Sequence, residues 1–102
     1  MRFEVYTTSA GNQRWRLIAG NGEEVANSGE NLTNAKRAAE SFKASAKTCE
    51  YDVYASGTNW RWRAKASNGQ IVASCGEPFV SQSNARRAAD NVKSNAGTAT
   101  GP

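Results

Sequence analysis

The sequence Asn34-Ala35-Lys36-Arg37-Ala38-Ala39-Glu40 returns at residues 84–90 as Asn84-Ala85-Arg86-Arg87-Ala88-Ala89-Asp90. In both stretches alanines recur at the three- and four-residue spacing that places side chains on one face of a helix. The opposite face is charged in both. Each stretch therefore predicts a helix whose narrow, alanine-lined face can lie close to a sheet.

The similarity between the two halves extends back from these helices to the start of the chain. The paired segments, in order, are 3–6 with 51–54, 14–16 with 61–63, 21–22 with 68–69, and 29–30 with 76–77. The copies differ by one residue in the first loop and by three before the helix, where loops tolerate changes in length. The chain is thus predicted to be a tandem repeat, with a first copy over 2–48 and a second over 50–96.

Each copy predicts three strands followed by a helix. The strands are expected at 2–8, 13–19 and 24–28, and again at 51–56, 60–66 and 70–75. Asn-Gly pairs at 21–22 and 68–69 predict tight hairpin turns with positive φ at both central residues. The predicted fold is α+β: one antiparallel sheet from both β-β-β-α units, with two helices packed on one face. We expect a single domain over 1–96, a disordered tail over 97–102, and a monomer that can dimerise through free strand edges.

The second strand of each copy decides which side chains face the helices. Residues 60–66 alternate strictly, with tryptophan and alanine on one face and basic residues on the other. Trp15 and Leu17 face inward in the first copy, and Ile18 is expected to face outward where the second copy has Lys65. The first strands alternate in the same way, with Phe3, Val5, Tyr51 and Val53 inward and Glu4, Tyr6, Asp52 and Tyr54 outward.

These motifs resemble a known family. The run W-R-(x)n-N-G-x-x-V-A-x-(S/C)-G-E, followed by an alanine-rich helix, is similar to the YegP-like bacterial domain of unknown function, which often occurs as a tandem pair. The resemblance covers about residues 3–96. It implies one sheet built from both units with the helices exchanged between them, and it implies no activity. The first copy lacks the segment Pro78-Phe79-Val80, so its path into the helix is expected to differ.

The composition argues against catalysis and against cofactors. The chain has 102 residues, no histidine and two cysteines. Histidine triads and histidine general bases are therefore excluded, and no spacing of ligands predicts a metal site. No glycine-rich phosphate loop is present. Cys49 and Cys75 are expected to be free thiols in a reducing cytoplasm, since no apolar run suggests a signal peptide or a membrane span. We predict a non-enzymatic protein.

A basic and aromatic sheet face is the remaining candidate for function. The net charge is +4, which permits an acidic partner without requiring one. Open sheets that bind nucleic acid combine arginines for phosphates with aromatic rings for bases. Two basic helix pairs, 36–37 and 86–87, offer a second patch suited to duplex phosphates. The candidate nucleic-acid-binding residues, for a single strand or a duplex, are Arg14, Arg16, Arg61, Arg63, Lys65, Tyr6, Tyr54 and Trp60.

Two other interpretations of this face stay open. Glu4 and Asp52 share it and can pair with arginines across strands, in which case the charges only keep the sheet soluble. Five bases against two acids leave an excess of positive charge that favours a function. The third interpretation is a protein–protein interaction module with a partner of unknown identity.

Overall fold

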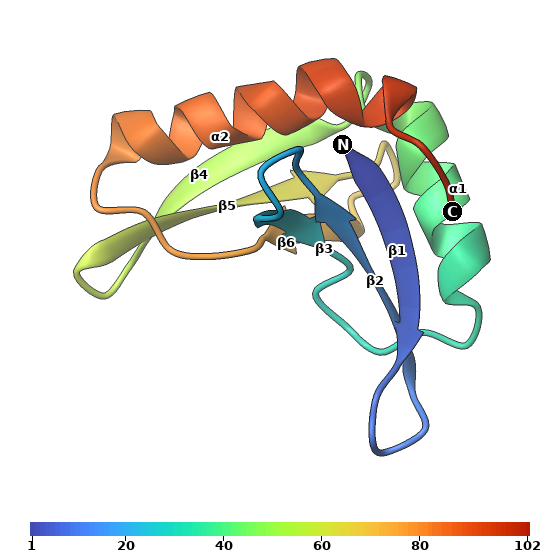
Figure 1. The fold of residues 1–102 in the computed structure, drawn as a ribbon. Helices are drawn as coiled ribbons and strands as arrows, with labels where there is room; N and C mark the ends of the chain where they lie inside the picture. Colours follow the sequence, from blue (N-terminus) through green and yellow to red (C-terminus); the bar gives the residue numbers. More distant parts are fainter.

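The computed structural model describes residues 1–102 and contains two successive β-β-β-α units (Figure 1). The first unit comprises β1 (Arg2–Thr7), β2 (Gln13–Ile18), β3 (Glu24–Asn27) and α1 (Ala35–Ser45). The second comprises β4 (Glu50–Ser56), β5 (Asn59–Lys65), β6 (Ile71–Cys75) and α2 (Gln82–Asn95), followed by a 3-10 turn, η1 (Ala96–Thr98). The order of elements in both predicted repeats is confirmed.

All strands belong to one six-stranded antiparallel sheet in the order β1-β2-β3-β6-β5-β4. The repeats join at its centre, where Ala26 lies opposite Cys75 and Asn27 opposite Ser74. The β1–β2 and β4–β5 hairpins point in different directions from this seam, so the sheet is strongly twisted (Figure 1). The predicted α+β fold, with both helices covering one face, is confirmed.

The hairpin turns form where the Asn-Gly pairs predicted them, with a different geometry. Gly22 has φ 87° and Gly69 has φ 84°, whereas no residue other than glycine has a positive φ. The amide of Gly22 donates to the carbonyl of Ala19, so a three-residue loop closes the hairpin, and the expectation of positive φ at both central residues was wrong. Each asparagine instead bonds an amide two residues on, as in Asn21 Oδ1 with Glu23.

The segment before each helix forms a β-bridge with the second strand of its own repeat. Leu32 forms a bridge with Gln13, and Phe79 forms the equivalent bridge with Trp60, so the two connections are alike where the sequence predicted a difference. The three additional residues of the second copy follow Phe79 and lengthen α2 at its start. Because each connection is held on its own second strand, α1 packs on β1 and β2, and α2 on β4 and β5. The expected exchange of helices between repeats was wrong.

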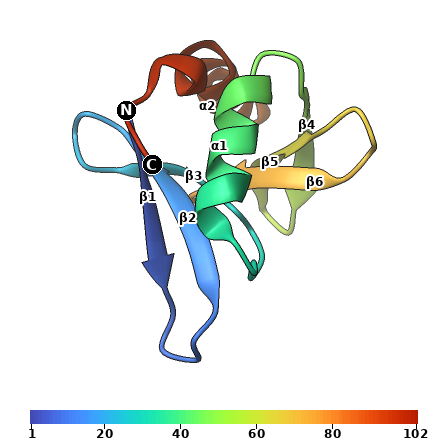
Figure 2. The ribbon, with the colours of Figure 1, turned by 90° about the vertical axis from the view of Figure 1, so that its right-hand side faces the viewer.

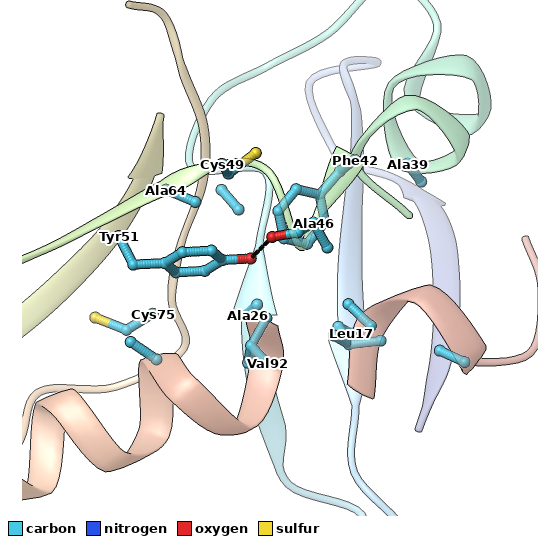
Figure 3. Packing of buried hydrophobic residues seen from close by; sticks show 14 of the residues in the cluster. Leu17, Ala26, Ala39, Phe42, Ala46, Cys49, Tyr51, Ala64, Cys75 and Val92 are labelled. Carbon is cyan, nitrogen blue, oxygen red and sulfur yellow. Dashed lines mark hydrogen bonds between the residues drawn. The ribbon is translucent and has the colours of Figure 1, made fainter. Parts of the chain in front are cut away.

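The core lies between the helices and the inner face of the sheet. Trp15 stacks on Phe42 of α1 with ring centroids 5.3 Å apart, and Trp62 is fully buried in the other repeat. Alanines bring the helices close to the strands, since those at 35, 39, 85 and 89 have no exposed surface. Figure 3 shows Tyr51 between these layers, with its hydroxyl pointing at the end of α1. Cys49 and Cys75 are buried free thiols, as expected.

The C-terminal segment has a defined structure through Thr100, so the prediction of a disordered tail over 97–102 was wrong. Residues 96–98 form η1, and Ala99 is buried. Thr100 then pairs with the start of β1, because its amide donates to Met1 and its carbonyl accepts from Phe3. The two ends of the chain consequently lie close together (Figure 2). The sequence showed no hydrophobic pattern here. Backbone hydrogen bonds join the segment to β1, and the burial of Ala96 and Ala99 in the core fixes it further.

None of the helices combines the length and the apolar composition that a membrane span requires.

Candidate nucleic-acid interface

The face of the sheet away from the helices, called the outer face below, carries a row of polar side chains that crosses all six strands. In the strand registers, Glu4 lies opposite Arg16, Asn27 opposite Ser74, and Arg63 opposite Asp52. Arg16 is also opposite Asn27, and Ser74 is opposite Arg63. The row therefore reads Glu-Arg-Asn-Ser-Arg-Asp from edge to edge. Each repeat contributes one half of it.

An arginine in each repeat is held between a carboxylate and a tyrosine ring. The Nε of Arg16 lies 3.0 Å from Glu4, and its guanidinium lies 4.8 Å from the ring centre of Tyr6. Arg63 lies at the same 4.8 Å from Tyr54, with its Nε 4.0 Å from Asp52. These positions place a cation over a ring, where the quadrupole of the ring attracts it. Arg16 and Arg63 are thus both engaged within the protein.

Further bases share the same two carboxylates. Arg2, which was not among the predicted site residues, lies 3.0 Å from Glu4, and Lys65 lies 3.0 Å from Asp52. The hydrogen bond from Arg2, followed by that from Arg16, lowers the pKa of Glu4 below its ordinary value. The cross-strand ion pairs expected for a solvated face are therefore present. Such exposed pairs contribute only about 0–1 kcal/mol each.

Arg14 and Arg61 differ from the other arginines of the outer face, because neither forms an ion pair with a carboxylate. Arg14 lies opposite Tyr6 and Arg61 opposite Tyr54, at equivalent places in the two repeats. The Nε of Arg14 is also buried without a hydrogen-bond partner. The Nε of Arg63 and the Nε1 of Trp62 are buried without a partner as well, so this feature does not distinguish Arg14 and Arg61 from the other residues of the sheet.

The structure brings together all but one of the predicted site residues. Trp60 points to the helix side, where it is half-buried and its backbone bridges Phe79, so it lies across the sheet from the arginines. Ile18 lies opposite Arg2 on the outer face, as expected, yet only 7% of it is exposed and it stands outside the main core. The alternation of residues predicted these faces. It did not reveal which arginines have carboxylate partners.

The predicted second basic patch on the helices is incomplete. Arg86 turns back to the sheet edge, where its Nη1 donates to the carbonyl of Tyr51 at 3.1 Å. Lys36, Arg37 and Arg87 are exposed on the outer surfaces of the helices and form no ion pairs. No group of acidic, cysteine and histidine side chains is arranged to hold a metal ion.

Comparison of the chain with known proteins shows which family its second repeat belongs to. The model of a domain of unknown function, DUF1508, matches residues 55–100, which is most of the second repeat. That repeat is a DUF1508 domain. The first repeat shares its motifs and its fold, so the predicted resemblance to YegP-like tandem domains is confirmed. No curated protein sequence matches the chain.

Two solved structures resemble the whole chain. A UPF0339 protein from Shewanella oneidensis is 25% identical with a TM-score of 0.80, and the match covers 97% of this chain and 86% of that one. YegP from E. coli, a protein of unknown function, is 29% identical with a TM-score of 0.76, and the match covers 97% and 88%. Both were determined by solution NMR. The fold is thus shared along nearly the full length of the chain.

Proposed function

We propose that the outer face binds nucleic acid through its phosphate backbone, with Arg14 and Arg61 as the first contacts. The observation that carries this proposal is that the two repeats each keep one arginine without a carboxylate at the same place beside a tyrosine. Arginine presents planar, always charged donors that match phosphate oxygens.

The ion pairs of the outer face make this binding weak. Arg16, Arg63 and Lys65 lie within 4.0 Å of Glu4 or Asp52, so these carboxylates compete with a phosphate for them. Exposed ion pairs are inexpensive to exchange, so these residues act as secondary contacts. We expect a binding affinity in the range of non-specific nucleic-acid association, roughly 10⁻⁴–10⁻⁶ M at physiological salt.

The test is fluorescence anisotropy with labelled single-stranded DNA, single-stranded RNA and duplex DNA, at low and near-physiological salt. About three to five phosphate contacts predict a slope of log K against log salt of about −2 to −4. The double variant Arg14→Glu/Arg61→Glu is expected to lose binding. Its matched control is Lys47→Glu/Lys93→Glu, which makes the same change of charge at exposed positions outside both basic patches. Equal loss in both variants would assign the binding to net charge and contradict the proposal.

A second candidate function, a protein-interaction module, is favoured by the edge of β4. The carbonyl of Tyr51 faces away from β5, because it accepts from Arg86, and the alternation of an antiparallel strand turns Val53 and Ala55 the same way. Their backbone groups have no strand partner, since β4 ends the sheet. A partner strand can add to such an edge. This candidate predicts salt-tolerant capture of one protein and no retention on nucleic acid.

A further inference from the structure

The outer face has an approximate twofold axis at its centre. Asn27 and Ser74 occupy equivalent positions in the two repeats, and they pair with each other in the sheet. The axis therefore passes between them, perpendicular to the sheet. It relates Arg14 to Arg61 and Arg16 to Arg63, which lie near opposite corners of the face because the strands of the two repeats run in opposite directions.

On the basis of the proposed function, we infer that the ligand of the outer face is a nucleic-acid duplex and not a single strand. The two backbones of a duplex run antiparallel and are related by twofold axes perpendicular to the helix. A symmetric protein surface matches that symmetry, as dimeric repressors match two half-sites. A single strand has a direction and no such axis, so it meets the two repeats in different orientations.

The surroundings of Tyr6 and Tyr54 also favour a duplex over a single strand. Single-strand binding by open sheets relies on aromatic rings with a free face on which bases stack. Here Arg16 lies over the ring of Tyr6, and Arg63 lies over the ring of Tyr54. The Nε of Arg16 also pairs with Glu4 at 3.0 Å, and the Nε of Arg63 lies 4.0 Å from Asp52. An arginine therefore occupies one face of each ring, which reduces the surface on which a base can stack.

The distance between Arg14 and Arg61, the two arginines without an ion pair, suits contact with both backbones of a duplex. Three strand spacings separate β2 from β5, and Arg14 and Arg61 each lie two residues from the central row in opposite directions. Standard strand dimensions place them about 20 Å apart along the sheet. The major groove opening of B-DNA is about 12 Å wide, so the two arginines lie farther apart than the groove and can flank it, one at each backbone.

The centre of the face predicts little preference for sequence. The amide nitrogen of Asn27 donates to Glu24 at 3.1 Å, and its oxygen accepts from the amide of Gly29 at 2.8 Å. This side chain is therefore occupied and does not read a base edge. Recognition rests on the phosphate positions, which carry no sequence information.

The experiment compares a labelled 20-base-pair DNA duplex, an RNA duplex of the same sequence and each separated strand, at low salt. We expect a duplex to bind at least tenfold more tightly than either of its strands, and the preferred duplex identifies DNA or RNA. A duplex of different sequence is expected to bind within twofold. Arg14→Gln and Arg61→Gln, which keep the side-chain stems, should weaken duplex binding equally, whereas Lys47→Gln at an exposed position outside both basic patches should not change it.

Three other results would each contradict the inference. Equal or tighter binding of a single strand removes the duplex inference and leaves the proposed function standing. Unequal effects of Arg14→Gln and Arg61→Gln contradict the symmetric placement on two backbones. If no nucleic acid binds at low salt, both the duplex inference and the proposed function fail. Circular dichroism of each variant shows whether the fold is retained, and the duplex-to-strand ratio of the unaltered protein needs no variant.

Discussion

The hydroxyl of Tyr51 donates a 2.8 Å hydrogen bond to the backbone oxygen of Ala46, and this bond ties the second repeat to the first (Figure 3). Tyr51 is on β4, whereas Ala46 is the capping residue directly after α1. The last carbonyls of a helix have no partner within it, so they need one from elsewhere. The first repeat has Phe3 at the place of Tyr51, so its inner face has no equivalent bond.

Removing this bond is expected to destabilise the protein. Tyr51→Phe keeps the ring and leaves the Ala46 oxygen without its donor in a buried place, which costs about 1–3 kcal/mol. Urea unfolding at pH 7 measures the loss. Tyr54→Phe on the outer face, where no hydrogen bond of the hydroxyl is lost, is the control and is expected to change stability by less than about 0.5 kcal/mol. Equal stability of the Tyr51→Phe variant and the unaltered protein would contradict the role of the bond.

The same residue predicts a loss of stability at alkaline pH. Burial, with a smaller effect from Cys49, raises the pKa of Tyr51 above its ordinary value. The folded state therefore keeps the proton that the unfolded chain releases above about pH 10. The contribution of Tyr51 is complete below that pH and decreases as the pH rises further. The stability difference between the unaltered protein and Tyr51→Phe should be constant from pH 7 to 9 and should shrink by pH 11. A constant difference would refute this assignment.

The seam between the repeats depends on Gly76. A Cβ at this position would collide with the backbone oxygen of Glu24 across the seam, and backbone cannot move aside as a flexible side chain does. Gly76→Ala is therefore expected to cost more than about 1 kcal/mol, measured by thermal or urea unfolding. Gly20→Ala is the matched control, since nothing lies within 4 Å of its Cβ and its φ is not positive. A similar cost for both substitutions would show that the seam is not the cause.

The repeat predicted most of this fold, for a physical reason. Both patterns of apolar residues show directly which side chains are buried. One is the alternation with period two, clearest in residues 60–66, and the other is the helical spacing of the alanines. Structure that depends on backbone hydrogen bonds was missed, as with Thr100 on β1 and Leu32 on Gln13, because such bonds leave no pattern of side chains. For the candidate site, alternation placed the arginines on one face. The carboxylate partners of these arginines could not be predicted without the register between β1 and β2. That register places Arg16 opposite Glu4 and Arg14 opposite Tyr6.

Close approach of the helices to the sheet makes their alanines sensitive to added volume. Ala39 on α1 has no exposed surface, so Ala39→Leu forces extra methylenes into a filled space and is expected to cost about 1–3 kcal/mol. Ala44 on the same helix is exposed, and Ala44→Leu should be close to neutral. Differential scanning calorimetry of both variants compares them. If Ala39→Leu were tolerated as well as Ala44→Leu, α1 would not lie as close to the strands as the structure shows.

Neutralising Glu4 is expected to strengthen nucleic-acid binding. The carboxylate engages both Arg2 and Arg16, so Glu4→Gln frees two guanidinium groups for phosphates. A gain of about 1 kcal/mol, or roughly fivefold in affinity, is expected for the released contacts. Glu40→Gln makes the same change of charge on an exposed position of α1 and controls for net charge. Anisotropy titrations at low salt compare the two variants on the same ligand.

The same substitution has an opposite effect on the protein alone. The pKa of Glu4 is lowered in the folded state, so its ionised form stabilises the fold above the ordinary carboxylate pKa of about 4.3, and this contribution is lost as the pH falls through the lowered value. Glu4→Gln should therefore be less stable than the unaltered protein at pH 7 and equally stable in strong acid. Tighter binding together with lower stability at pH 7 shows that Glu4 competes with phosphate for the same arginines. Tighter binding in Glu40→Gln to the same extent would contradict that competition.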